Sequence, residues 1–301
     1  MEGKGLSSRK AMYVLMCVLV AVWGLDYIAA KFALVTLDPL SLLFYKAVAA
    51  FLLVLILKLK FDKGPLFRKK DIWLFAVSVL FGDVLYFFSE YTAMSYMPVS
   101  LVSIVIGFVP IVSIMIERIL YKKRANPKII TGVFICIVGM SLIIGVDWSI
   151  LFQGRIFGYL LALSCVFCWN IFNFMTASLH ERYTTITLTL NQLICVCIML
   201  LPYALFKSPP VSEFTLDLLW EILYLGIFSN GLGFLILVRA LHILGPTTTV
   251  LFSNFLPVAA TFFGWLFLNE IIAPIQFAGG AIVILAGYFV IKERDRNASA
   301  V

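Results

Sequence analysis

Two acidic residues interrupt the apolar stretch FGDVLYFFSEY, which runs from residue 81 to residue 91. Asp83 and Glu90 are seven positions apart, and Tyr86 and Phe87 lie between them. On an α-helix this spacing places all four side chains on one face, over two turns or about 10 Å. A charged carboxylate at mid-bilayer costs at least about 2.5–3.5 kcal/mol, so such residues face a cavity or a partner. We therefore expect Asp83 to line a cavity, where it binds a cationic substrate or titrates as the substrate is released.

A structural role is the alternative for Asp83, as a carboxylate that pairs with Lys46 or Lys31 and holds helices together. Lys46 lies inside an apolar stretch of its own, where an unpaired lysine would tend to lose its proton. We expect Lys46 to pair with Asp26 or Asp83. The residues assigned to proton coupling or charge pairing are Asp26, Lys46, Asp83 and Glu90.

Tryptophans accompany these charges. Trp23 lies one helical turn before Asp26, and Trp169 follows 146 residues later, with Asn170 and Asn173 after it. An aromatic cage with nearby carboxylates suits a primary or quaternary ammonium, because cation–π attraction contributes roughly 0.5–2 kcal/mol per ring. A place in an interfacial aromatic belt is the alternative for the two indoles. The residues assigned to substrate binding are Trp23, Asp26, Tyr27, Asp83, Tyr86, Phe87, Trp169, Asn173, Asn230 and Asn254.

Composition places these residues in a membrane. Of the 301 residues, 62% are hydrophobic and 13% are charged, and the mean hydropathy is +1.05. Apolar runs of about 20 residues, the length that spans a bilayer, recur along the whole chain. The sequence predicts an all-α polytopic membrane protein with ten transmembrane helices, at residues 11–34, 41–59, 71–95, 99–120, 127–146, 155–178, 185–206, 217–240, 246–268 and 272–291.

The positive charge indicates an orientation. The chain carries a net charge of +7, and most Lys and Arg residues lie at span ends rather than in a patch with interleaved aromatics, which argues against a nucleic-acid partner. Of the 23 basic residues, 19 fall on one side of the predicted membrane, 3 fall on the other and Lys46 lies within a span. Basic loops face the cytoplasm, so we expect both termini there, in a prokaryotic inner or plasma membrane.

An internal repeat organises the spans. With an offset of 147 residues, 81–143 aligns with 228–290, Asp83 with Asn230, and Pro110 of GFVP with Pro257 of NFLP. Each copy holds five spans, an odd number, so the two halves, 1–150 and 151–301, cross the membrane in opposite directions. Inverted repeats are typical of secondary transporters, whose sites lie near the midplane between the repeats. We expect both prolines to break their helices where these line a cavity.

These features together resemble a known family. Ten spans in two inverted halves, WGLDYIAAKFAL at 23–34, the two proline turns and FLNE at 267–270 are similar to the EamA branch of the drug/metabolite transporter superfamily. The resemblance implies alternating-access transport of small organic metabolites through a central cavity, with no ATP-binding domain. The chain departs from the usual family pattern at Asp26, at Lys46 and in the two acids of its third span.

The expected function follows from what is present and what is missing. The sequence shows no phosphate-binding glycine loop, no metal-ligand cluster and no nucleophile with a base, so we expect no cofactor, no metal and no enzymatic activity. We expect a proton-coupled secondary transporter of a small organic metabolite, a cationic or zwitterionic amine. Export of neutral or aromatic amino acids is the alternative. The expected partners are the substrate, protons and the lipid bilayer, and the sequence does not indicate an oligomeric state.

Overall fold

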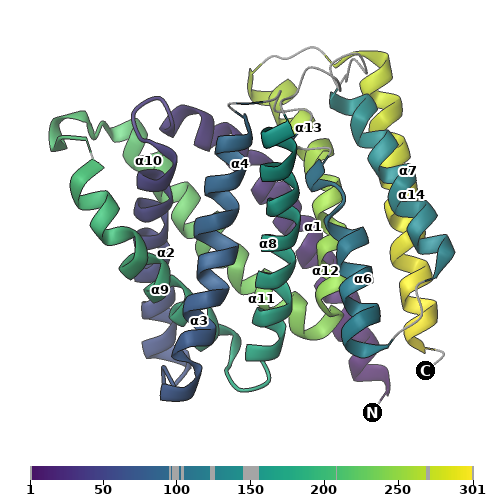
Figure 1. Cartoon of the computed structure of the whole chain (residues 1–301), viewed down its shortest axis with the longest axis horizontal. Helices are drawn as coiled ribbons and strands as arrows, with labels where there is room; N and C mark the ends of the chain where they lie inside the picture. Colours follow the sequence, from purple (N-terminus) through teal and green to yellow (C-terminus); the bar gives the residue numbers. More distant parts are fainter. Residues whose placement is uncertain are drawn as a thin grey trace.

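The chain folds into a bundle of helices. The computed structural model describes residues 2–94, 96, 102, 105–122, 126–144, 156–207, 209–268 and 272–299. Every regular element in this part of the chain is helical (Figure 1). Within it, eight helices are long and apolar enough to cross a membrane, and Pro127–Ile143 forms a shorter apolar helix. The predicted span at 99–120 lies partly outside the described residues. The prediction of an all-α polytopic membrane protein is confirmed.

The helices follow the predicted spans closely in both halves of the chain. Those before residue 150 are α1 (Glu2–Ala33), α2 (Pro39–Phe61), η1 (Lys69–Asp71), α3 (Ile72–Val79), η2 (Leu80–Leu85), α4 (Tyr86–Met94), α6 (Val109–Tyr121) and α7 (Pro127–Ile144). Those after it are α8 (Ile156–Leu179), α9 (Thr185–Lys207), η4 (Val211–Glu213), α10 (Leu216–Tyr224), η5 (Leu225–Gly233), α11 (Phe234–Leu244), α12 (Pro246–Leu251), η6 (Phe252–Phe255), α13 (Leu256–Leu268) and α14 (Pro274–Ser299).

Two π-helices correct the expectation of an uninterrupted α-helix through residues 81–91. Six residues at η2 and nine at η5 form wider turns, with Asp83 in the first and Asn230 in the second. Glycine permits close packing at both. A Cβ atom at Gly82 would overlap the ring of Phe172 in α8, and one at Gly226 would overlap α2. Only Tyr86, Phe87 and Glu90 therefore share regular α-helical spacing.

Helix boundaries follow local chemistry. The Asp38 carboxylate caps α2 by accepting hydrogen bonds from the backbone N–H groups of Leu40 at 3.0 Å and Ser41 at 3.2 Å. Pro110 lies in the first turn of α6, after a turn at 107–108, and Pro257 is the second residue of α13, after the 3₁₀ turn η6. Both prolines thus stand where a helix begins, a position that needs no N–H donor.

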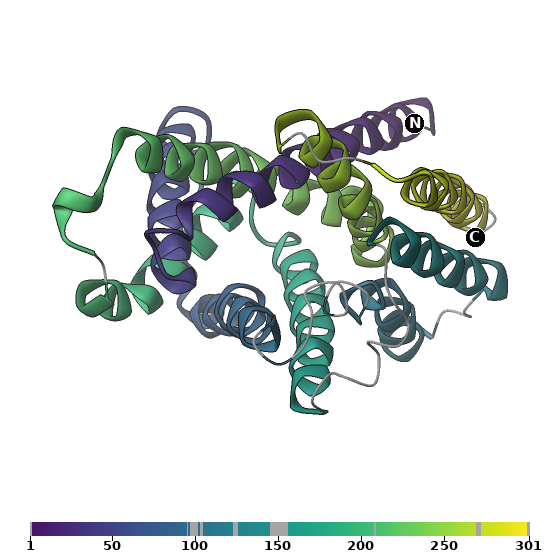
Figure 2. The ribbon, with the colours of Figure 1, turned by 90° about the horizontal axis from the view of Figure 1, so that it is seen from above.

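The two repeats pack around each other. Seen from above, α7 and α14 lie next to each other on one side of the bundle, and α2, α9 and α10 lie on the far side (Figure 2). Equivalent positions meet between α7 and α14, because Cys136 Sγ lies 3.9 Å from the carbonyl oxygen of Val283, 147 residues later. Gly139 and Gly279 allow this close approach.

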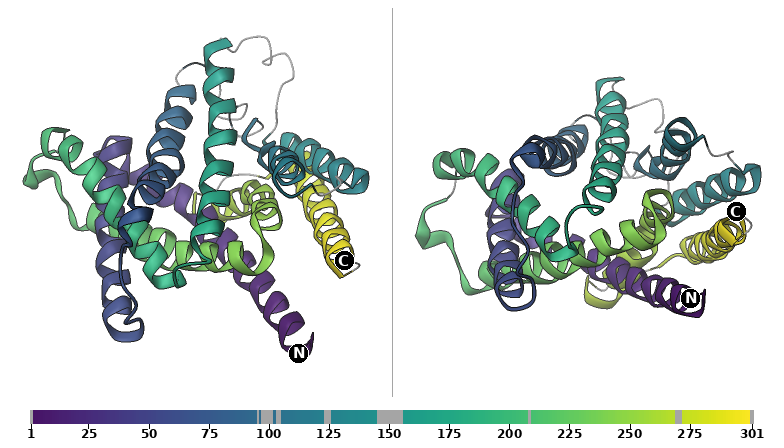
Figure 3. Two further views of the ribbon diagram at one scale, coloured as in Figure 1. Left: turned by 60° about the horizontal axis from the view of Figure 1, so that its bottom comes forward. Right: turned by 90° about the horizontal axis from the view of Figure 1, so that it is seen from below.

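Both chain termini lie at the same end of the bundle (Figures 1 and 3). The ends of α2 and α14 and the starts of α3 and α9 lie there too. We call it the basic end, since it carries Lys58, Lys69, Arg182 and Arg294, and we call the other the opposite end.

Two apolar clusters enclose the middle of the bundle. One joins α1, α8 and α11 around the fully buried Phe172 and includes Trp23 and Trp169. The other joins α2 and α9 around Ala50 and includes Phe87. The stretch from η2 to α4 contacts both clusters, so the residues on it are positioned by both repeats.

Candidate functional site

Three carboxylates surround one lysine in the middle of the bundle. Lys46 on α2 interacts electrostatically with Asp26 on α1, Asp83 on η2 and Glu90 on α4. None of the three forms an ion pair of 4 Å or shorter with Lys46, whose Nζ instead lies 4.9 Å from the centre of the Phe87 ring. Asp83 is 4% exposed and Glu90 is 8% exposed. Four ionisable groups thus share one buried region without direct contact, which leaves their charges open to a ligand or a proton.

Each carboxylate has its own neighbours. The Tyr86 hydroxyl donates to Glu90 Oε1 over 3.4 Å. The Ser229 side chain, on η5, interacts with Asp26, whose Oδ1 is buried without a hydrogen-bond partner among the described residues. Lys31, the other lysine considered for pairing with Asp83, has a side chain outside the described set.

Aromatic rings line the same region. Trp23 and Trp169 contact each other edge to face, with their ring centres 6.4 Å apart. The ring centre of Tyr86 lies 5.3 Å from that of Trp169, and Phe172 stacks on Trp169 with ring centres 5.3 Å apart. The two indoles therefore come together from symmetric helices, as the repeat predicts, but they touch rather than standing on opposite walls of a cavity.

The predicted amides lie in different surroundings. Asn173 Nδ2 donates to the Trp169 carbonyl at 2.7 Å, and its Oδ1 has no partner among the described residues. Asn230 is buried on η5. Asn254 is buried on η6 beside Cys136 of α7. The side chain of Tyr27 lies outside the described set.

Sequence reasoning missed a second group of polar residues. Gln192 on α9 donates through Nε2 to Thr176 Oγ1 at 2.8 Å and to Ser78 Oγ at 3.3 Å. Ser78 and Thr176 are fully buried, and Gln192 is nearly so. The polar run Thr187, Thr189, Asn191, Gln192 within an apolar span was the available signal.

Ion pairs join helices at the basic end. Asp71 binds Arg182 and accepts a hydrogen bond from the Tyr183 hydroxyl at 2.8 Å, and Glu117 binds Arg294 at 2.9 Å.

Asp62, beyond the end of α2, forms another polar contact there. It lies 3.1 Å from Lys58 and accepts hydrogen bonds from Thr184 and Thr187. Burial acts to raise its pKa, but these hydrogen bonds outweigh it and hold the pKa well below its usual value. The ionised carboxylate therefore fastens α2 to α9.

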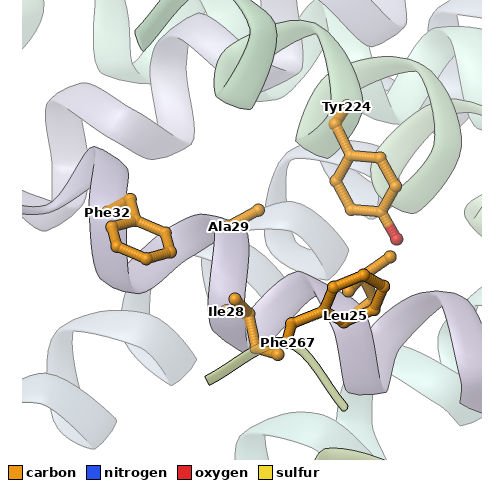
Figure 4. Close-up of a pocket in the computed structure, with 6 residues that line it drawn as sticks. All are labelled: Leu25, Ile28, Ala29, Phe32, Tyr224 and Phe267. Atoms are coloured by element: carbon orange, nitrogen blue, oxygen red, sulfur yellow. The ribbon is translucent and has the colours of Figure 1, made fainter. Parts of the chain in front are cut away.

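A cavity of about 400 Å³ lies beside the C-terminal half of α1 (Figure 4). Its lining is apolar apart from the Tyr224 hydroxyl, which donates to the Val22 carbonyl at 3.0 Å. The lining residues are Leu25, Ile28, Ala29, Phe32, Tyr224 and Phe267. Among the side chains that the structure describes, none of those assigned to the site lines it.

Comparison with known proteins agrees with this architecture. The EamA-like transporter family matches the chain twice, at residues 10–145 and 156–292. A solved crystal structure superposes with a TM-score of 0.77 over 95% of this chain and 98% of that one, at 15% identity. This likeness shows the fold, ten helices as two inverted five-helix repeats.

Curated relatives are named as transporters. The "Uncharacterized transporter YoaV" of Bacillus subtilis is 25% identical, with 89% of this chain and 92% of the relative covered. An "Uncharacterized transporter" of Archaeoglobus fulgidus is 27% identical, covering 94% and 99%. A "Probable amino-acid metabolite efflux pump" of Salmonella typhimurium is 25% identical, covering 94% and 95%. Two family matches that together span most of the chain show that this integral membrane protein belongs to the EamA-like transporter family.

Proposed function

We propose that the protein is a proton-coupled secondary transporter of a small organic ammonium compound, cationic or zwitterionic. It works by alternating access between the five-helix halves 1–150 and 151–301. The substrate ammonium binds among Asp26, Asp83 and Glu90, against the rings of Trp169 and Tyr86.

The observation that carries this proposal is the excess of negative charge around Lys46. Three carboxylates and one ammonium leave two negative charges when all are ionised. Buried charge of that size calls for cations, and the site can gain them as protons or as a substrate. Aromatic faces beside the carboxylates favour an organic cation over a metal ion.

Competition between protons and substrate would supply the coupling. A protonated Asp83 has lost the charge that attracts an ammonium, whereas a bound ammonium disfavours protonation. The site then carries protons in one direction and substrate in the other. With its basic end toward the cytoplasm, as the Lys and Arg distribution favours, an inward proton gradient would drive export.

Export of neutral or aromatic amino acids is the second candidate. It is favoured by Lys46, which could bind the carboxylate of a zwitterion while Asp83 binds its ammonium. The names of the Salmonella typhimurium relative and of an Escherichia coli relative, each a "Probable amino-acid metabolite efflux pump", support this candidate.

Counterflow in proteoliposomes tests both candidates. The probes are phenyltrimethylammonium, whose fixed charge prevents passive entry, and L-phenylalanine and L-leucine. Uptake of phenyltrimethylammonium, increased by an acidic interior, is the expected result. Uptake of L-phenylalanine or L-leucine alone would favour the amino-acid exporter. Uptake of none of the three above that of empty liposomes would contradict the proposed substrate class.

A further inference from the structure

A group of buried polar side chains lies between Asp83 and the basic end of the bundle. Its members come from α3, α8 and α9, and each is at most 3% exposed. We call this group the polar seam, made of Ser78, Asn173, Thr176, Thr189 and Gln192. The hydrogen bonds of Gln192 to Thr176 and Ser78 join the three helices at its centre.

Three oxygens of the polar seam have no hydrogen-bond partner among the described residues. They are Asn173 Oδ1, Thr189 Oγ1 and Gln192 Oε1. A buried acceptor left unsatisfied costs about 1–3 kcal/mol. Asn173 lies one turn from Thr176, and Thr189 lies one turn from Gln192, so the three oxygens border the central contact. Water is the small donor that satisfies such a group of acceptors.

One end of the polar seam reaches the candidate site. Asn173 hydrogen-bonds the carbonyl of Trp169 one turn away. Gln192 lies one turn from Cys195, which interacts electrostatically with Asp83. Ser78 precedes Asp83 by five residues on the same helix. The polar seam is therefore linked to Asp83 through Cys195 on α9 and along the continuous helix from α3 to η2.

Its other end reaches two histidines. Thr176 is one turn before His180, whose ring stacks on His242 of α11 with centres 4.2 Å apart. These are the two histidines of the entire chain. Burial, with His242 and Arg239 nearby, lowers the pKa of His180 to about 4. Its neutral ring can both accept and donate a proton. Nε2 contacts Thr185 Oγ1 at 2.7 Å, and Nδ1 is buried without a partner among the described residues.

The hydroxyl groups of the polar seam are not repeated at the equivalent positions of the other half of the chain. The position equivalent to Gln192, 146 residues earlier, is Lys46, and that of Thr176 is Ala30. Ser78 corresponds, 147 residues later, to Leu225, which is fully buried. Apolar side chains thus replace the hydroxyl groups on the opposite side of the site.

We propose that the polar seam is a water-filled path along which protons pass between Asp83 and the basic end, with His180 and His242 at its mouth. A proton leaves the Asp83 carboxyl for the adjoining water, and another leaves the far end of the chain of waters for the histidines or the solvent. This inference rests on the proposed proton coupling and adds a route to it, because protons that bind Asp83 from the opposite end leave it toward the basic end through the polar seam.

Hydroxyl radicals generated in bound water by X-rays test whether the seam holds water. The Ser78→Cys variant places an oxidisable sulfur in the seam. Ser113→Cys is the matched control, since Ser113 is equally buried on α6 and its hydroxyl pairs with Thr247 at 3.0 Å. Mass spectrometry should find Cys at position 78 oxidised at least about tenfold faster. Rates within about twofold of each other would overturn the proposal.

Replacing the polar Gln192 at the centre of the seam with an apolar residue tests whether the seam carries protons. Gln192→Leu should slow proton-driven accumulation of phenyltrimethylammonium about tenfold while leaving exchange, which moves no net proton, within about twofold. It should also lower the oxidation of Ser78→Cys to the Ser113→Cys rate.

Asp83→Asn separates this inference from the proposed function. If Gln192→Leu accumulates the probe normally while Asp83→Asn does not, the path is wrong and the coupling stands. If both variants accumulate it normally, coupling through Asp83 and the path are both wrong.

Discussion

Asp83 and Asn230 occupy matching π-helical turns in the two halves, yet only Asp83 can ionise. Both side chains are buried, and the amide shows that this position accepts a neutral group of the same shape. The charge of Asp83 is thus not needed for the turn itself. Its use must lie in what Asp83 meets, namely Lys46, a substrate or a proton.

Asp83→Asn should therefore fold normally and lose proton-driven accumulation of phenyltrimethylammonium by at least about tenfold, because an amide cannot release a proton. Exchange should survive if Asp83 serves coupling, and should weaken if it binds the cation. Glu90→Gln, whose repeat mate is Leu237, should reduce transport less. Accumulation equal to that of the parent would leave Asp83 as a structural charge and direct attention to Asp26 and Glu90.

Trp169 touches Trp23, Tyr86 and Phe172 at once. Trp169→Ala and Trp23→Ala should each reduce counterflow by at least about tenfold, through loss of the aromatic faces beside the carboxylates. Trp220→Ala removes an indole that is 71% exposed on α10 and should leave transport unchanged. Gel filtration checks the fold of each variant. Normal counterflow in both site variants would assign the two rings to packing.

At the scale of elements, the sequence predicted the positions of most membrane spans but few of the contacts between them. Hydropathy and the repeated prolines located the spans, because length and helix breaking are local properties. The π-helix at η2 was missed, since the Phe172 ring that packs against Gly82 comes from another helix and leaves no local signal in the sequence. The contact of Gln192 with Thr176 was missed for the same reason. The common face of Tyr86, Phe87 and Glu90 was predictable because their spacing matches the turns of one regular α-helix.

Gly82→Ala tests that packing. The added Cβ would overlap the Phe172 ring, and such overpacking costs about 1–3 kcal/mol. We expect a lower melting temperature in detergent together with weaker transport, since the turn holds Asp83. Gly280→Ala is the control, because a Cβ there meets nothing within 4 Å. Equal melting temperatures for the two variants would show that η2 does not depend on this contact.

The contact between α2 and α9 should depend on pH through Asp62. Hydrogen bonds from Thr184, Thr187, the Gly64 N–H and Lys58 favour its ionised form over the effect of burial and lower its pKa. Its stabilisation is therefore present above the unfolded pKa of about 3.9 and is lost as the pH falls below it.

Asp62→Asn should lower the melting temperature at pH 7, and the difference from the parent should shrink as the pH falls below about 4. Glu213→Gln, on an exposed residue of η4, should show no such difference. A deficit in Asp62→Asn that stays constant across this range would assign its effect to shape rather than charge.

At the scale of the whole molecule, a bundle whose helices cross a membrane has its two ends in different compartments. Impermeant thiol labelling of intact cells, with native cysteines replaced, tests which end faces inward. Cys residues at the exposed positions Lys63 and Lys122, near the basic end, should react only after the membrane is opened. A Cys at Ser212, on η4, should react from outside. Labelling of Lys63→Cys in intact cells would reverse the orientation.

Among the described residues, every ion pair lies at the basic end, including Asp71 with Arg182 and Glu117 with Arg294. The position equivalent to Asp71 is Leu218, 147 residues later, which is buried in an apolar cluster with Ile222. The two ends therefore differ in the interactions that hold their helices together. Under the proposed alternating access, opening the basic end separates charges and opening the opposite end separates apolar surfaces. The two steps should therefore differ in their dependence on salt and temperature.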